Sequence, residues 1–231
     1  MWRHDSAQGW TERDQGMKQV IDLIRKEFEL KEQTVGEFSA LKVGPMKFSI
    51  EHWDGGALGN VSYMAASGMM GLMKMETLII NPVKADLPLM SLDTVLAMGK
   101  LTVIAEIYDT TIGGFDQAPC QTVKETLASH PDRPMSSSWY DSIKLSCSWG
   151  KKTGKKALQA LEKGLEEYVQ AYLSVAEKTP ELADGLLEQK RQKADAYVNG
   201  LLEHGGPSTD VFVKHLGKEK TGKLFREVLF G

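Results

Sequence analysis

Residues 80–108 read INPVKADLPLMSLDTVLAMGKLTVIAEIY, and they place one carboxylate in apolar surroundings. Asp93 has apolar neighbours on both sides: Leu89, Met90, Leu92, Val95 and Leu96. A carboxylate that loses its hydration in such surroundings responds with a raised pKa and partial protonation. The stretch therefore indicates a protein acid at Asp93.

The same stretch ends in a strand-like run, and several others occur in the middle of the chain. Each is a short apolar segment bounded by Gly, Pro or Asp, which is the pattern of a β-strand. These runs cover residues 38–43, 47–53, 72–80, 101–108 and 142–149. No helical pattern separates them, so we expect neighbouring strands to pair antiparallel.

Helical patterns flank these strands on both sides. Residues 15–31 form an amphipathic helix with apolar side chains at helical spacing. Further helical segments begin at residue 153 and then cover 180–203, 208–216 and 218–230. The order of helix, strands and helices predicts an α+β fold with a mainly antiparallel sheet. We expect one domain over residues 17–231, preceded by an extension at 1–16.

Composition and motifs exclude several classes of protein. The 231 residues carry a net charge of -3, which gives no field that would attract nucleic acid. The N-terminus lacks a signal-peptide core, and no apolar run is long enough to span a membrane. Cys120 and Cys147 have neither CxxC nor metal-ligand spacing, so we expect a cytoplasmic protein with no metal and no membrane contact. Dinucleotide and phosphate-binding loops are also absent, so electrons for any redox reaction would come from another protein.

A second carboxylate, Glu76, lies in the strand-like segment before Asp93. Strand alternation puts Glu76 on one face with Lys74, Leu78 and Ile80. If Asp93 follows in a loop, the two carboxylates converge on a shared cavity, and repulsion raises one pKa. In the alternative, Glu76 pairs with a lysine and Asp93 caps a helical turn at 94–100.

Two further features are open to a ligand-binding or a purely structural interpretation. Seven of the eleven methionines surround these acids, where they would line a site for a flat conjugated ligand or fill the core: residues 64, 69, 70, 73, 75, 90 and 98. One basic patch would attract ligand carboxylates or an acidic protein such as a ferredoxin, or would be a solvated helix start: Lys144, Lys151, Lys152, Lys155 and Lys156.

The stretch quoted above resembles the ferredoxin-dependent bilin reductases. In that family a strand ends in a Pro-containing turn, passes through Asp-Leu-Pro, here residues 86–88, and reaches a catalytic Asp, here Asp93. The C-terminal sequence AYVNGLLEHGGPSTDVFVKHLGKEKTGKLFREVLFG, residues 196–231, also resembles the family's ending, with Gly217 and the terminal Leu229 and Phe230. The likeness extends from about Met17 to the end of the chain.

The resemblance implies an α/β/α sandwich that holds a linear tetrapyrrole between the sheet and the C-terminal helices. Electrons arrive singly from reduced ferredoxin and protons from acids, without a bound cofactor. Asp93 is the implied proton donor. Several family members have a His seventeen residues before this Asp, and in this sequence that position is Glu76. A second family Asp falls on Gly206, and Asp210 lies one helical turn further on. Substrate contacts are expected from Lys144 and Lys214 with the propionates, and from Asp210 and Met64.

The sequence is also compatible with three other interpretations. The fold would also suit a tetrapyrrole or haem carrier without electron transfer, which the replaced His and second Asp favour. An enzyme acting on another conjugated or cyclic tetrapyrrole would explain Glu76 as a shifted protonation site. An interaction module without a small-molecule ligand is the third.

Overall fold

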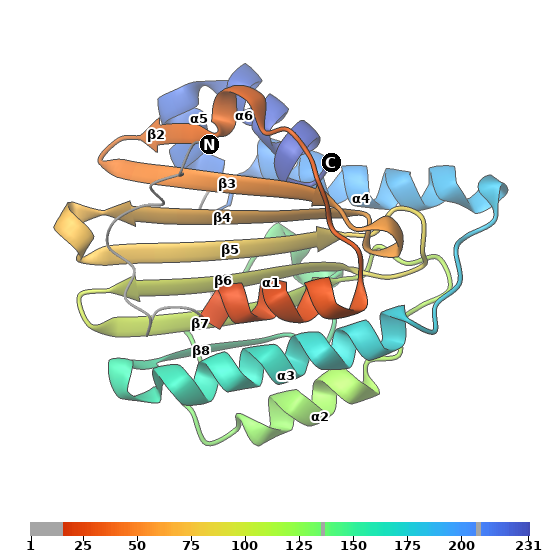
Figure 1. Cartoon of the computed structure of the whole chain (residues 1–231), viewed down its shortest axis with the longest axis horizontal. Helices are drawn as coiled ribbons and strands as arrows, with labels where there is room; N and C mark the ends of the chain where they lie inside the picture. The colour runs from red at the N-terminus through yellow and green to blue at the C-terminus, as the bar shows by residue number, and fades with distance from the viewer. Residues whose placement is uncertain (1–15, 135–136, 207–208) are drawn as a thin grey trace.

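The computed structural model describes residues 16–134, 137–206 and 209–231. In this part of the chain, a broad antiparallel sheet is covered by helices on both faces (Figure 1). This arrangement confirms the predicted α+β sandwich. The extension expected at residues 1–16 lies outside the described residues, except for Gly16, which begins the first helix.

The sheet has eight strands, and each pairs antiparallel with its neighbour. The order across the sheet is β1-β3-β4-β5-β6-β7-β8, with β2 also paired to β3. The strands are β1 (Lys31–Glu32), β2 (Ala40–Val43), β3 (Met46–Asp54), β4 (Asn60–Gly68), β5 (Met73–Asn81), β6 (Leu89–Ala97), β7 (Lys100–Tyr108) and β8 (Trp149–Gly154). From β3 to β7 the chain is therefore a meander, joined by short connections.

The described helices fall into two groups. The α-helices are α1 (Gly16–Glu27), α2 (Ala118–Thr126), α3 (Leu158–Ala176), α4 (Asp184–His204), α5 (Thr209–Leu216) and α6 (Lys218–Leu224). Short helical turns complete the structure: η1 (Gly36–Phe38), η2 (Gly56–Leu58), η3 (Met69–Gly71), η4 (Trp139–Ser142), η5 (Lys155–Ala157) and η6 (Phe225–Leu229). Helices α1, α2 and α3 cover one face of the sheet, and the C-terminal helices cover the other (Figure 1). None of the described helices is long and apolar enough to cross a membrane.

Alternation along the strands divides the buried side chains between two cores. In β5, Leu78 and Ile80 pack into the core under α1 and α3, whereas Ile79 packs into the core under the C-terminal helices. Successive side chains of a strand point to opposite faces of the sheet. Since helices cover both faces, the position of a residue along its strand decides which group of helices its side chain contacts. This division determines which polar residues meet in one site.

Several predicted elements differ from those observed. The strands β4 and β6 were not expected, and the strand predicted at residues 142–149 is largely a turn, with β8 beginning only at Trp149. The helix predicted from residue 153 begins only at Leu158, as α3, because residues 149–154 form strand β8. Asp93 also lies in the middle of β6, so the expectations that it follows a strand in a loop or caps a helical turn are both wrong.

Candidate functional site

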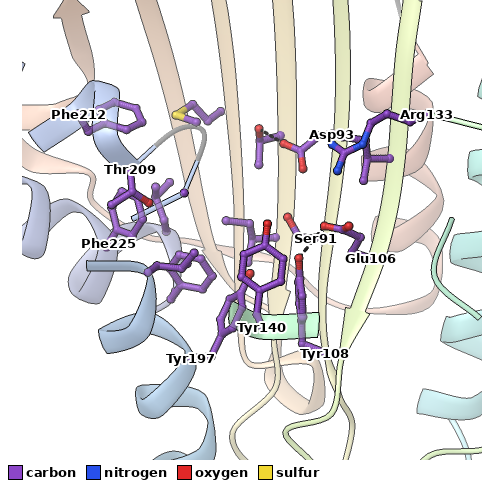
Figure 2. A pocket seen from close by; sticks show the side chains of 18 residues that line it. Ser91, Asp93, Glu106, Tyr108, Arg133, Tyr140, Tyr197, Thr209, Phe212 and Phe225 are labelled. Carbon is purple, nitrogen blue, oxygen red and sulfur yellow. Dashed lines mark hydrogen bonds between the residues drawn. The ribbon is translucent and has the colours of Figure 1, made fainter. Parts of the chain in front are cut away.

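A cavity lies between the sheet and the C-terminal helices (Figure 2). Its volume is about 160 Å³, which is smaller than the roughly 300–1,000 Å³ typical of small-molecule sites, and its mouth is open to solvent. The sheet contributes side chains from β4, β5, β6 and β7, and the opposite wall comes from α4, α5 and the C-terminal turn. Its polar lining is Thr77, Ser91, Asp93, Glu106, Arg133 and Thr209, with the hydroxyls of Tyr108, Tyr140 and Tyr197.

Asp93 lies on the sheet side of this cavity. Thr77 stands directly opposite it across the β5–β6 pair and donates a hydrogen bond of 2.6 Å to the carboxylate. Burial raises the pKa of Asp93 to about 6, and the charge of Glu106 adds to this increase. Hydrogen bonds from Thr77 and Ser91 and the charge of Arg133 act in the opposite direction but do not cancel it. The carboxyl group is therefore half protonated at about pH 6, and about a tenth of it is still protonated at pH 7.

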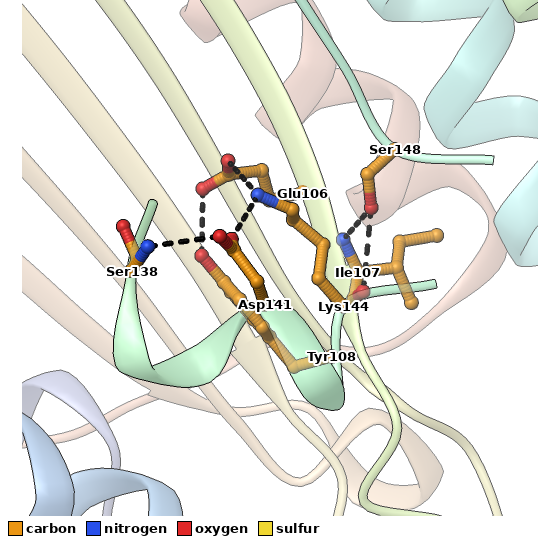
Figure 3. Close-up of polar contacts among 7 residues, drawn as sticks. All are labelled: Glu106, Ile107, Tyr108, Ser138, Asp141, Lys144 and Ser148. Atoms are coloured by element: carbon orange, nitrogen blue, oxygen red, sulfur yellow. Dashed lines mark hydrogen bonds and ion pairs between the residues drawn. The ribbon is translucent and has the colours of Figure 1, made fainter. Parts of the chain in front are cut away.

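Glu106 is the second carboxylate of the cavity. It lies on β7 opposite Ser91, so it shares a sheet face with Asp93 on the neighbouring strand. The Tyr108 hydroxyl donates to Glu106 at 2.6 Å, and the Lys144 ammonium lies 3.6 Å from its other oxygen (Figure 3). Sequence reasoning missed Glu106, although a lone carboxylate in the apolar segment LTVIAEIY was a usable signal.

Lys144 supports Glu106 from outside the cavity. Its ammonium contacts Asp141 at 2.7 Å as well as Glu106 (Figure 3), and its side chain is 16% exposed. Burial alone would lower the pKa of Lys144, but the hydrogen bond to Asp141 and the charge of Glu106 outweigh it and raise the pKa. Lys144 is thus engaged by two carboxylates and is not among the cavity-lining residues.

Glu76 lies on the opposite face of the sheet from this cavity. It accepts hydrogen bonds from the Tyr63 hydroxyl at 2.5 Å and from the Thr94 hydroxyl at 3.2 Å. With Lys74 and Glu162 it borders a small separate hollow beside α3. The expected convergence of Glu76 and Asp93 is therefore wrong. The family's spacing of seventeen residues assigned the His position to Glu76. The strand pairing instead puts Thr77, sixteen residues before Asp93, directly opposite it.

Some of the other residues expected at the site line the cavity, and others lie outside it. Met64 is buried and lines the cavity, and so does Gly206, where the resemblance places a second family Asp. Lys214 and Asp210 are exposed on α5 and do not line it. A side chain added at Gly206 would meet only ordinary contacts, with Leu201 at 3.4 Å the nearest. Gly206 is thus a cavity position that lacks a functional group.

Arg133 brings a cation to the cavity from the segment between α2 and η4. Its backbone N–H is fixed by the carbonyl of Gly150 at 2.9 Å, and its guanidinium points toward Asp93 (Figure 2). The buried Nε of Arg133 has no hydrogen-bond partner. A buried, unpaired guanidinium donor is costly unless a ligand satisfies it, and its fork geometry matches a carboxylate. Nothing in the sequence pattern singled out this residue.

Aromatic side chains, not methionines, form half of the remaining wall. They are Tyr108, Tyr140, Tyr197, Phe212, Phe225 and Phe230. Of the methionines singled out from the sequence whose side chains the structure describes, only Met64 lines the cavity, and Met90 packs in the core on the other side of the sheet. Aromatic rings stack favourably on flat conjugated groups, so the wall suits a planar ligand.

Comparison with known proteins supports the fold-level expectation. The sequence matches no protein-family model, and no curated protein matches it. Among solved structures, the chain is similar to phytochromobilin synthase from tomato in complex with biliverdin, with a TM-score of 0.73. The match covers 93% of this chain and 81% of that one, at 11% sequence identity. At this identity the two proteins are shown to share a fold.

Proposed function

We propose that this chain reduces a linear tetrapyrrole, with electrons from reduced ferredoxin and a proton from Asp93. The observation that carries the proposal is the position of Asp93, whose pKa is raised to about 6, in an aromatic-walled cavity between the sheet and the C-terminal helices. The fold shared with a biliverdin-bound protein supports the choice of ligand class.

The reaction adds two electrons and two protons to one double bond of the tetrapyrrole. Two reduced ferredoxins each give up one electron and leave oxidised. Asp93 gives one proton to the substrate, becomes a carboxylate and regains a proton from water, and the second proton comes from solvent at the open mouth. A carboxylic acid with a pKa near the working pH is suited to this transfer.

Arg133 is the cavity group best placed to hold a substrate carboxylate or lactam oxygen. Among the described lining residues it is the one Lys or Arg, and its Nε is unpaired. This replaces the expectation that Lys144 and Lys214 hold the propionates, because Lys144 is bound to Glu106 and Asp141 and Lys214 lies outside the cavity. Glu106, held by Lys144 and Tyr108, lies near Asp93, and its charge raises the pKa of Asp93.

One observation favours a second candidate, a carrier that binds the tetrapyrrole without reducing it. Thr77 stands opposite Asp93 and Gly206 lines the cavity, so two positions near the site lack titratable groups. A carrier needs the cavity and Arg133 but no proton relay. Binding alone therefore does not separate the two candidates, whereas turnover does.

The test is an absorption titration with biliverdin, followed by anaerobic addition of a ferredoxin reducing system. We expect a changed spectrum on binding and then the spectrum of a reduced bilin. Gly206→Phe should block binding by filling the cavity without backbone strain, whereas Gly185→Phe, in open space on α4, should bind normally. Binding without reduction would support the carrier, and no binding by the unmodified chain would contradict both candidates.

A further inference from the structure

Two neighbouring hairpin connections present apolar side chains to solvent at one end of the sheet. The β4–β5 connection carries Met70 and Leu72, and the β6–β7 turn carries Met98 (Figure 1). Their relative exposures are 101%, 58% and 78%, and the N–H of Met98 donates to the carbonyl of Leu72 at 3.2 Å. Because Met73 pairs with Ala97 and Met98 bonds to Leu72, the two connections lie side by side. Their three side chains are three of the four exposed large apolar side chains among the described residues.

The backbone at these positions makes their residue types unusual. Met70 and Met98 have φ angles of 54° and 48°, and in the described ranges they are the two non-glycine residues with positive φ. Asn, Asp and Gly tolerate this left-handed conformation, while Met has no local hydrogen bond to offset its cost. Because each side chain is also exposed, neither the turn nor the core explains a methionine there. Presentation of an apolar tip to a partner would explain both.

Positive charges lie on both sides of the apolar tips. Lys42 and Lys47 flank the β2–β3 turn at the same end of the sheet. Lys100 begins β7, and Lys152 lies two residues before the end of β8. All four are exposed, and none makes an ion pair in the described part of the chain. The segments 42–47, 67–74 and 96–101 contain no Asp or Glu, although the whole chain has a net charge of -3.

We propose that this end of the sheet, the hairpin surface of Met70, Leu72 and Met98 with its four lysines, docks on an anionic lipid bilayer. Separate, protruding apolar side chains with lysines on both sides suit the interface of a membrane, which accepts apolar tips and attracts cations. A protein partner would favour a flatter surface on which apolar groups pack together. The contact is peripheral, needs no membrane-spanning segment and does not rest on the proposed reductase activity. It replaces the expectation from sequence that the chain makes no membrane contact.

The test measures sedimentation of the full chain with phosphatidylcholine vesicles, with and without phosphatidylglycerol. We expect binding only when phosphatidylglycerol is present, and weaker binding as salt rises from about 0.05 M to about 0.5 M and shortens the Debye length. Met70→Asn with Met98→Asn should weaken binding at least about tenfold, because two apolar side chains are lost. Asn suits both backbone conformations, so the melting temperature should not fall.

Charge variants provide a matched control for the electrostatic part. Lys42→Gln with Lys100→Gln should lower binding to the anionic vesicles, whereas Lys26→Gln with Lys178→Gln removes the same charge elsewhere and should leave it nearly unchanged. Equal weakening by both pairs would overturn a local docking surface. Failure of the unmodified chain to bind the anionic vesicles would also overturn the proposal. If the chain instead self-associates without binding vesicles, and the two Asn substitutions abolish this, the surface is a contact between copies of the chain.

Discussion

Asp93 combines partial burial with a hydrogen bond from Thr77 and an adjacent carboxylate, Glu106. Folding raises its pKa from 3.8 to about 6, so the folded chain binds this proton more tightly than the unfolded chain does. The favourable contribution is present below the unfolded pKa and is lost as pH rises through about 6. At neutral pH the ionised Asp93 therefore destabilises the fold, as expected of a group retained for function.

Replacing Asp93 with Asn tests this electrostatic cost. Asn keeps an oxygen that accepts from Thr77 but carries no charge. We expect the free energy of unfolding to increase by roughly 1–3 kcal/mol at about pH 7.5, and the gain to vanish below about pH 4, where Asp93 is protonated in both states. Denaturant unfolding at several pH values measures this difference. A gain that is equal at all pH values would contradict the raised pKa.

Glu76 and Glu106 differ in the face of the sheet they occupy, and their variants should differ accordingly. Glu106→Gln removes a charge that raises the pKa of Asp93, so the pH above which reduction declines should move below about 6. Glu76→Gln lies behind the sheet and should leave this pH profile unchanged. Single-turnover reduction across pH provides the readout. A shift with Glu76→Gln of the same size would place that residue in the site after all.

At the scale of elements, short apolar runs bounded by turn residues identified β3, β5 and β7, although β5 and β7 are largely buried on both faces. β3 alternates between buried and exposed residues, and its pattern was recognised. β4 is buried almost throughout because helices cover both faces, so it shows no alternation. In β6, Ser91 and Asp93 face the cavity and interrupt the apolar pattern. Asp93 was predicted from its own surroundings, but Arg133 reaches it only through tertiary packing.

Gly200 and Gly185 test how α4 packs against η4, which contributes Tyr140 to the cavity. A Cβ at Gly200 would come within 2.2 Å of the Trp139 ring, whereas one at Gly185 would meet nothing within 4 Å. Alanine stabilises an unobstructed helix position by up to about 1 kcal/mol relative to glycine. We therefore expect Gly185→Ala to raise the melting temperature and Gly200→Ala to lower it, at a cost of about 1–3 kcal/mol. Stabilisation by Gly200→Ala would contradict the close contact.

At the scale of the whole molecule, a buried lysine joins α4 to the sheet. Lys190 is 0% exposed and donates to the carbonyls of Leu87 and Thr110 at 2.5 and 3.0 Å, and to the Thr110 hydroxyl at 2.8 Å. Burial lowers the pKa of Lys190 to about 8. This connection fixes the helix that carries Tyr197 over the cavity, so the wall opposite Asp93 depends on it.

Lys190→Met should therefore affect both stability and ligand binding. Two buried carbonyls lose their donor, and we expect the free energy of unfolding to fall by roughly 1–3 kcal/mol. Biliverdin should also bind more weakly, because α4 is less firmly held. The control is Arg191→Met at the next, exposed position, which should change neither quantity appreciably. Chemical denaturation and the absorption titration give the two readouts, and a normal affinity for Lys190→Met would contradict the dependence of the cavity on this connection.

The most direct test of the proposed chemistry compares the unmodified chain with Asp93→Asn in a single anaerobic turnover of bound biliverdin with reduced ferredoxin. Both proteins should bind the pigment with similar affinity, since Arg133 and the aromatic wall are intact. The unmodified chain should form a reduced bilin, and the variant should be slower by about 100-fold or more, the usual loss when a general acid is removed. Near-equal rates would contradict the assignment of Asp93 as the proton donor.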